Sequence, residues 1–340
     1  MSFKDILGQD RAVVFLKSSI AGGRVAHAYI FFGPEGVGKR SAALNFAKAL
    51  NCGGKDAPCD PSAGSGSHAE LVEACDECVS CRKIDAGNHP DVIVLNLADT
   101  GEREKEKTSI GIEEIREAQR RIWLKPYEAH TKVYIIDGAE YLTSQASNAL
   151  LKTMEEPPPQ TVMILLAKSV RELLPTIASR AEHVKFFPLQ AGTVKDILTK
   201  RHKIDGAKAD ILSRISCGSA GKALLYDNAD FSGQRKEVIE ALKKKRFLEM
   251  ETDGLSKTEL KMRLEIMLSW YRDLLVAKAG TEGAPEFINF DERSAIELSA
   301  RDAEFDMLDD AIKQIISTGE MLDQSANTKL AMAALGLKLN

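Results

Sequence analysis

Apolar residues in the first half of the chain occur in short runs that alternate with stretches of helical spacing. Runs rich in Val, Ile and Phe predict buried strands, and apolar residues that recur every three or four positions predict helices. Strands that alternate with helices are typical of an α/β fold whose parallel sheet is covered on both faces. The predicted strands are residues 28–32, 91–95, 132–137, 161–167 and 182–186, with helices at 39–51, 110–124 and 144–156.

The pattern changes after Pro188, where helical spacing continues and no further strand is predicted. Short helical segments are expected between residues 193 and 226. The chain is therefore predicted to contain an α/β domain at 1–187, a small helical domain at 188–229 and an all-helical domain at 230–340. Longer helices are expected at residues 234–250, 257–279, 287–300, 304–322 and 323–338.

The composition is that of an ordinary globular protein, with 340 residues, 44% of them hydrophobic and 28% charged. A net charge of −4 argues against a protein whose whole surface grips nucleic acid. The first residues lack the layout of a secretory signal, and no apolar run approaches the ~20 residues that a membrane helix needs. A cytoplasmic protein with no membrane partner is expected.

A glycine-rich turn lies between the first predicted strand and the helix that follows it. Gly33, Gly36 and Gly38 would let backbone N–H groups turn toward phosphate oxygens, and Lys39 would reach the β- and γ-phosphates of ATP. In active enzymes of this kind, a Ser or Thr after the lysine ligates Mg²⁺. Arg40 stands at that position, so the motif favours ATP binding and makes hydrolysis doubtful.

A second nucleotide motif ends the strand at residues 132–137. Asp137 has the position of the aspartate that holds Mg²⁺ in P-loop enzymes. Active relatives of the motif carry a Glu next, which polarises the attacking water, but here Gly138 follows and the next acid is Glu140. Since hydrolysis needs both the metal and the water in place, slow or absent hydrolysis is expected.

Cysteines cluster in residues 52–81, which suggests an inserted metal module because disulfides are disfavoured in a reducing cytosol. Cys75, Cys78 and Cys81 have the spacing of metal ligands. A structural zinc ion needs four soft ligands in a tetrahedron. The fourth ligand is Cys52 or Cys59, and Cys52 is favoured because the end of a helix is a fixed anchor.

Other conspicuous features are expected to be structural or solvated. Residues 62–67 form a low-complexity loop and residues 101–107 a mixed-charge loop. Cys217 lies alone in a helical region and is expected to be a small core residue. By its residue type alone, Arg180 is expected to be a surface ion-pair residue.

Taken together, these residues resemble the clamp-loader family of AAA+ proteins, and the resemblance covers nearly the whole chain. It rests on the cysteine module and on four sequence segments. These segments are HAYIFFG at 27–33, NALLKTMEEPP at 148–158, LPTIASR at 174–180 and NTKLA at 327–331.

The resemblance implies the stator type of subunit in the clamp loader of the bacterial replicative DNA polymerase III. Its partners would be gamma/tau and delta subunits in a hetero-pentamer that loads the sliding clamp onto primer–template DNA. Arg180 would be an arginine finger, offered in trans to ATP on the neighbouring ATPase subunit. Residues 188–229 would be a lid and residues 230–340 part of a collar, and the chain would belong to a DNA-directed DNA polymerase assembly without being an ATPase itself.

The chain departs from the family pattern at Ala181, where a cysteine is usual, at Lys222, near the place of a sensor arginine, and in its fifth clustered cysteine. Two alternatives stay open. One is an active gamma/tau-type ATPase, which Arg40, Gly138 and the end of the sequence at Asn340 without a long tail disfavour. The other is a zinc-stabilised adapter with a vestigial nucleotide fold.

Overall fold

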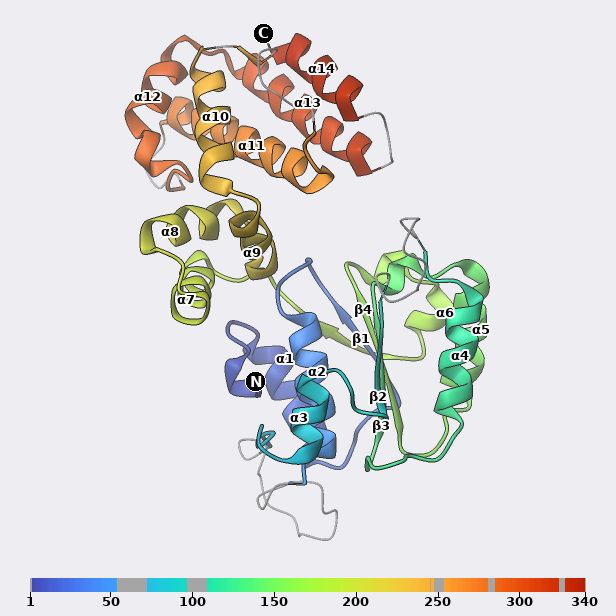
Figure 1. Cartoon of the computed structure of the whole chain (residues 1–340). Helices are drawn as coiled ribbons and strands as arrows, with labels where there is room; N and C mark the ends of the chain where they lie inside the picture. The colour runs from blue at the N-terminus through green and yellow to red at the C-terminus, as the bar shows by residue number, and fades with distance from the viewer. Residues whose placement is uncertain are drawn as a thin grey trace. The chain divides into compact units, whose positions relative to one another are not determined.

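The protein was analysed as a computed structural model, which describes residues 2–53, 72–96, 109–244, 246–247, 254–280, 285–323 and 328–339. The chain divides into two compact units, Met1–Leu189 and Gln190–Asn340. The first unit is α/β and the second is helical (Figure 1). Within the described residues, none of the helices combines the length and the apolar character needed to cross a membrane.

The first unit is built on a five-stranded, fully parallel sheet with the strand order β2-β3-β4-β1-β5. Three strands have the predicted bounds, while β2 begins one residue later and β5 ends one residue earlier than predicted. Because β4 separates β1 from β3, the loops that follow β1 and β3 lie on either side of β4, at the carboxyl ends of the strands. The strands are β1 (Ala28–Phe32), β2 (Val92–Leu95), β3 (Lys132–Asp137), β4 (Thr161–Ala167) and β5 (Glu182–Lys185).

Both faces of the sheet are buried, as the apolar runs predict. In β1, Tyr29 and Phe31 belong to one core cluster, and Ala28 and Ile30 belong to the other. Successive side chains of a strand point to opposite faces, so a continuous apolar run serves two cores. On one face lie α1 (Asp10–Ala21), α2 (Lys39–Asn51) and α3 (Val79–Asp85), and on the other α4 (Ile112–Ile122), α5 (Ser144–Glu155) and α6 (Pro175–Ala178) (Figure 1).

The sequence analysis did not predict three of these helices, α1, α3 and α6. The signal for α1 was present, because Ala12, Leu16 and Ile20 recur every four residues and are its buried positions. The two others are short, with seven and four residues. Short 3₁₀ turns complete the chain at η1 (Phe3–Asp5), η4 (Ala139–Tyr141), η5 (Val170–Glu172) and η7 (Phe290–Glu292).

The second unit contains helices throughout its described residues, as predicted. The predicted helix at residues 257–279 has the observed bounds of α11. The structure treats residues 190–340 as one unit, so the division at 229/230 stays a prediction. The helices are α7 (Ala191–His202), α8 (Gly206–Ile215), α9 (Ala220–Asn228), α10 (Phe231–Lys244), α11 (Lys257–Ala279), α12 (Arg293–Asp302), α13 (Phe305–Asp323) and α14 (Thr328–Leu339).

The predicted helix at 287–300 begins later than expected, because a buried polar network holds the preceding segment out of helical form. The fully buried carboxylate of Asp273 accepts hydrogen bonds from the backbone N–H groups of Ile288 (3.0 Å) and Asn289 (2.7 Å). Arg235 pairs with Asp291 at 2.7 Å. The Asp273 carboxylate thus accepts hydrogen bonds from backbone N–H groups that would otherwise donate within a helix.

Two expectations about single features need comment. The prediction that Cys217 is a core residue is wrong, because Cys217 is exposed in the turn after α8, with a φ of 50°. The loops predicted at 62–67 and 101–107 lie outside the described residues.

A buried carboxylate that the sequence analysis overlooked organises the turn before β3. Asp91, 3% exposed, accepts hydrogen bonds from the backbone N–H groups of Tyr127, Glu128 and Ala129 at 2.8–3.0 Å. Burial alone would raise the pKa of Asp91, but these hydrogen bonds outweigh it and hold the pKa below its usual value.

We expect Asp91→Ala to lower the free energy of unfolding by about 3 kcal/mol, because it leaves several buried N–H groups without an acceptor. Urea denaturation measures the loss. The exposed Glu113→Ala is the control, with an expected change below about 0.5 kcal/mol. Because the pKa of Asp91 is depressed on folding, its contribution is complete above about pH 4 and is lost as the pH falls through the folded pKa. Equal loss in both variants would contradict this role.

Candidate functional site

The glycine-rich turn has the backbone geometry of a phosphate-binding loop. Gly33, Gly36 and Gly38 have φ values of 147°, 72° and 105°, which side-chain-bearing residues rarely adopt. A Cβ at Gly33 would lie 2.2 Å from the carbonyl oxygen of Phe186, so only glycine fits there. Helix α2 begins at Lys39, directly after the loop, so the loop lies at the amino end of this helix.

Gln9 fastens this loop to the end of β5, a role that the sequence analysis missed. Its buried side-chain amide donates to the carbonyl oxygens of Val37 (3.2 Å) and Phe187 (2.7 Å). Its side-chain oxygen accepts from the backbone N–H of Phe187 at 3.1 Å. The only sequence signal was a polar residue just before a helix, which is far more often a simple cap.

Lys39, the first residue of α2, extends its ammonium back into the loop and donates to the carbonyl oxygens of Gly33 (2.6 Å) and Pro34 (2.7 Å). Burial lowers the pKa of Lys39, while Glu140 and Asp137 oppose that effect. Burial also raises the pKa of Glu140, whose Oε2 is buried without a hydrogen-bond partner among the described residues.

Arg40 and Asp137 are brought together at the carboxyl edge of the sheet. The Arg40 guanidinium lies 3.3 Å from Oδ2 of Asp137, and the two side chains are 51% and 32% exposed. Gly138 continues the chain with a φ of 84°, and Glu140 follows in η4, beyond the end of the strand as expected. The positions that would hold a metal in a P-loop enzyme are thus joined by an ion pair.

Arg180 lies at the opposite end of the sheet from the phosphate loop. It comes two residues before β5, whose first residue pairs with Tyr29 at the start of β1. Gly33 follows the end of β1, four residues later, so about 13 Å of strand separates the two levels. The guanidinium donates to the carbonyl oxygen of Thr176 (3.0 Å) and pairs with Glu155 at 2.8 Å, and 38% of the side chain stays exposed.

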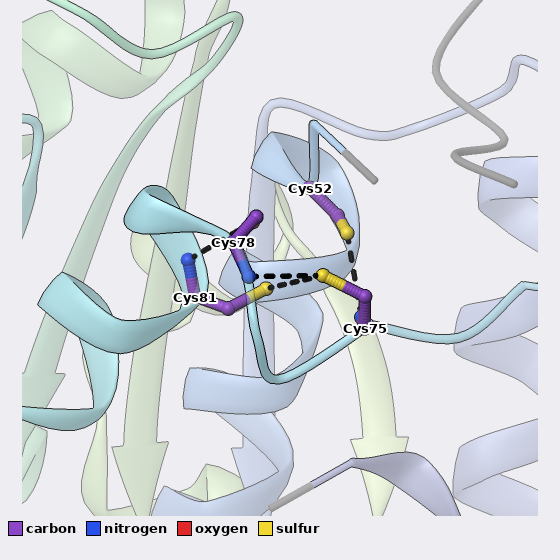
Figure 2. Close-up of side chains that lie close together, drawn as sticks. All are labelled: Cys52, Cys75, Cys78 and Cys81. Carbon is purple, nitrogen blue, oxygen red and sulfur yellow. Dashed lines mark hydrogen bonds between the residues drawn. The ribbon is translucent and has the colours of Figure 1, made fainter. Parts of the chain in front are cut away.

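Four cysteine side chains gather where α2 ends and α3 begins (Figure 2). The sulfur atoms of Cys52, Cys75, Cys78 and Cys81 all lie within 4.8 Å of one another. Backbone N–H groups of Cys75, Cys78 and Cys81 donate to the sulfurs of Cys52, Cys75 and Cys78 at 3.3, 3.3 and 3.5 Å. The other candidate for the fourth thiol, Cys59, lies outside the described residues.

The cysteine cluster fits a tetrahedral metal ion. Four sulfurs at about 2.3 Å from a central ion lie about 3.8 Å apart, and Cys75 and Cys81 are already 4.0 Å apart. Burial opposes ionisation of Cys78, but hydrogen bonds led by the Cys81 N–H lower its pKa to about 7. A cluster of this kind can hold a metal ion, with N–H donors stabilising the thiolates.

Lys48 joins the cysteine cluster to the helix that carries the phosphate loop. It lies on α2 with no exposed side-chain area and pairs with Asp76 (2.5 Å) and Asp85 (2.9 Å), on either side of the cluster's later cysteines. Burial opposes the ammonium, but the two carboxylates outweigh it and raise the pKa of Lys48. The sequence analysis missed this residue, since a lysine within a helix is usually solvated.

The first unit thus belongs to the class of P-loop α/β domains, here with an inserted cysteine cluster. Comparison with known proteins gives the family. A family model described as DNA polymerase III, delta subunit matches residues 8–190, and one described as DNA polymerase III, delta subunit, C terminal matches residues 229–339.

Individual relatives agree with the family models. The DNA polymerase III subunit delta' of Bacillus subtilis is 31% identical over 81% of this chain and 79% of that protein. The subunit delta' of Pseudomonas aeruginosa is 30% identical over 74% of this chain and 72% of its own length. The chain therefore belongs to the family of DNA polymerase III delta' subunits.

Similarity also extends to other subunits. The Bacillus subtilis subunit tau is 30% identical over 90% of this chain, which spans 56% of that longer protein. Among solved structures, a gamma subunit-related protein from Thermotoga maritima aligns over 96% of this chain and 98% of its own, with 16% identity and a TM-score of 0.49. That score is too low to add to the family assignment.

We expect Lys48→Met to lower the free energy of unfolding by about 2 kcal/mol. Loss of a buried partner costs more, but Asp76 and Asp85 keep some exposure to water, which reduces the penalty. Lys83→Met is the matched control, because Lys83 pairs with Glu128 at the surface and its loss should cost less than about 1 kcal/mol. Thermal unfolding of both variants is the measurement, and equal shifts would rule out a special role for Lys48.

Proposed function

We propose that this chain is the stator subunit of a DNA polymerase III clamp loader. It assembles with gamma/tau and delta subunits in a hetero-pentamer that loads the sliding clamp onto primer–template DNA. In that assembly it offers Arg180 in trans to the ATP on a neighbouring ATPase subunit. Membership of the delta' family supports the assignment to the loader.

The position of Arg180 carries the proposal for its role. An arginine at the amino end of the edge strand β5, about 13 Å of strand away from the chain's own phosphate loop, is badly placed to serve a nucleotide bound there. Its partly exposed guanidinium is instead accessible to another chain. An arginine finger stabilises charge that develops on the transferred phosphoryl group.

We propose that this chain does not hydrolyse ATP at its own phosphate loop. Arg40 replaces the hydroxyl residue that ligates Mg²⁺, and Gly138 replaces the acid that polarises water. The gamma/tau-type ATPase is the second candidate function, favoured by the similarity to subunit tau. The Arg40–Asp137 ion pair weighs against it, because it occupies the position of the metal.

The second unit is proposed to supply the lid, at residues 188–229, and a collar segment, at residues 230–340. Lys222, near the place of a sensor arginine, forms an ion pair with Glu265 of α11. This contact pairs the lysine with a carboxylate of its own unit. The pairing agrees with a lid whose Lys222 does not contact a bound nucleotide as a sensor arginine would.

The cysteine cluster is proposed to hold a structural zinc ion, with Cys52, Cys75, Cys78 and Cys81 as ligands. Four sulfur ligands suit a soft or borderline ion in tetrahedral geometry, and a site closed by four protein ligands has no open position for chemistry. The role of the ion would be to fix α3 against the end of α2. The alternative of a zinc adapter with a vestigial nucleotide fold shares this site but gives Arg180 no part in hydrolysis.

We expect Arg180→Ala to lower ATP hydrolysis at the neighbouring site about 10³-fold, because the transition-state charge loses its partner. The test uses a reconstituted loader with clamp and primed DNA, in which the other motor subunits carry inactivated phosphate loops. Arg180→Lys should also be defective, since lysine lacks the planar fork of N–H donors.

The control is Arg171→Ala, which removes an exposed arginine from η5, after the carboxyl end of β4, and should leave hydrolysis unchanged. Gel filtration checks that each variant still assembles. Full hydrolysis by an assembled Arg180→Ala loader would refute the role in trans and would favour the adapter.

For the metal, we expect elemental analysis of the purified full chain to find about one zinc ion per molecule. Cys81→Ser should lose the ion and unfold at a lower temperature, because Cys81 is buried in the cluster. Cys217→Ser, which changes an exposed cysteine in the other unit, should keep both the zinc and the stability. Unchanged zinc content in Cys81→Ser, or a different metal in the wild-type chain, would contradict the proposed site.

A further inference from the structure

The chain's own phosphate loop keeps the backbone cradle for phosphate, but an ion pair occupies the two positions that would hold the metal. The three glycines keep positive φ values, and Lys39 remains in the loop. In P-loop enzymes the hydroxyl after the lysine and the aspartate at the end of the second strand hold Mg²⁺ between them. Here Arg40 and Asp137 occupy those two positions, with the guanidinium 3.3 Å from the carboxylate.

Mg²⁺ does not fit between these residues. The ion demands near-octahedral coordination by oxygen atoms at about 2.0–2.1 Å, and Arg40 brings no oxygen. The positive guanidinium lies against the carboxylate oxygen that the ion would need, so it competes for that oxygen and repels the cation. The nearest hydroxyl in sequence, on Ser41, is turned about 100° around α2.

Arg40 has the chemistry to do what the metal does for the phosphates. In P-loop enzymes, Mg²⁺ links phosphate oxygens to the aspartate and neutralises charge. A guanidinium carries five N–H donors in a fixed fork and binds phosphate in a bidentate manner. The hydrogen bond from Arg40 to Asp137 uses one of those donors, and half of the Arg40 side chain is exposed.

The charge around the loop is consistent with this substitution. A metal would add two positive charges beside Asp137, whereas Arg40 adds one that is permanent. Lys39 supplies another in the loop. A third lies on Lys168 at the end of β4, whose ammonium is 3.5 Å from Glu35 of the loop. Three cations therefore lie in or beside the cradle, together with the carboxylates of Glu35, Asp137 and Glu140.

We propose that the loop binds the phosphates of a nucleoside di- or triphosphate in metal-free form, with Arg40 in place of Mg²⁺ as the link to Asp137. This deepens the proposed function, on which it rests only for the identity of the ligand class. The bound nucleotide would be held without hydrolysis, as a fixed part of the subunit.

The test is the affinity of the full chain for ATP and for ADP, measured by isothermal titration calorimetry in excess EDTA and in excess Mg²⁺. We expect the dissociation constants in the two conditions to agree within about twofold for the wild-type chain. Arg40→Thr restores a hydroxyl and should bind at least about tenfold more tightly in Mg²⁺ than in EDTA.

Two controls locate the effect. Lys39→Ala should lose binding in both conditions, which places the nucleotide in this loop. Arg116→Thr removes an exposed arginine on α4 and should behave as the wild-type chain. Circular dichroism checks that each variant is folded.

Two results would overturn the inference. One is a wild-type affinity that rises about tenfold or more with Mg²⁺. The other is the absence of nucleotide binding in both conditions. Neither result touches the proposed role of Arg180, which is measured by hydrolysis at the neighbouring subunit's site.

Discussion

Helix α2 is the constraint on which the rest of the first unit depends. Nine of its thirteen residues are buried, and small residues such as Ala42, Ala43 and Ala47 let it lie close against the sheet. Its amino end forms the phosphate loop, and its carboxyl end carries Cys52. With a rise of about 1.5 Å per residue, the helix separates the two sites by roughly 20 Å. Lys48, inside the helix, fixes the cysteine cluster to it through Asp76 and Asp85.

The features that the sequence predicts well are those in which residue type and local spacing suffice. The apolar runs of β1, β3 and β4 set their bounds, and the glycine-rich turn between strand and helix sets the phosphate loop. Residues whose role depends on distant partners escaped prediction. Gln9 acts on Phe187, and Asp91 on residues 127–129, across separations that no local pattern encodes. Asp273, which lies in α11, likewise delays the start of α12, because it accepts a hydrogen bond from the backbone N–H of Asn289.

The two arginines that matter most differ in what the sequence says about them. Arg40 was conspicuous in the sequence, because it replaces the hydroxyl residue of a motif whose chemistry is known. In the structure it pairs with Asp137, the other residue that would hold the metal. Arg180 is unremarkable by residue type alone. The LPTIASR segment at 174–180 and its place before the edge strand β5 distinguish it from other surface arginines. One chain thus has a loop unsuited to a metal at one end of the sheet and an accessible cation at the other. Under the proposed function, these two ends would face different nucleotides.

The contact between Arg180 and Glu155 has a thermodynamic consequence. A free arginine side chain has about 2 kcal/mol of rotamer entropy to lose when it is immobilised. Glu155 and the carbonyl of Thr176 already restrict that side chain in the isolated subunit. Under the proposed function, part of the ordering cost is therefore met when the first unit folds, before a partner engages the guanidinium.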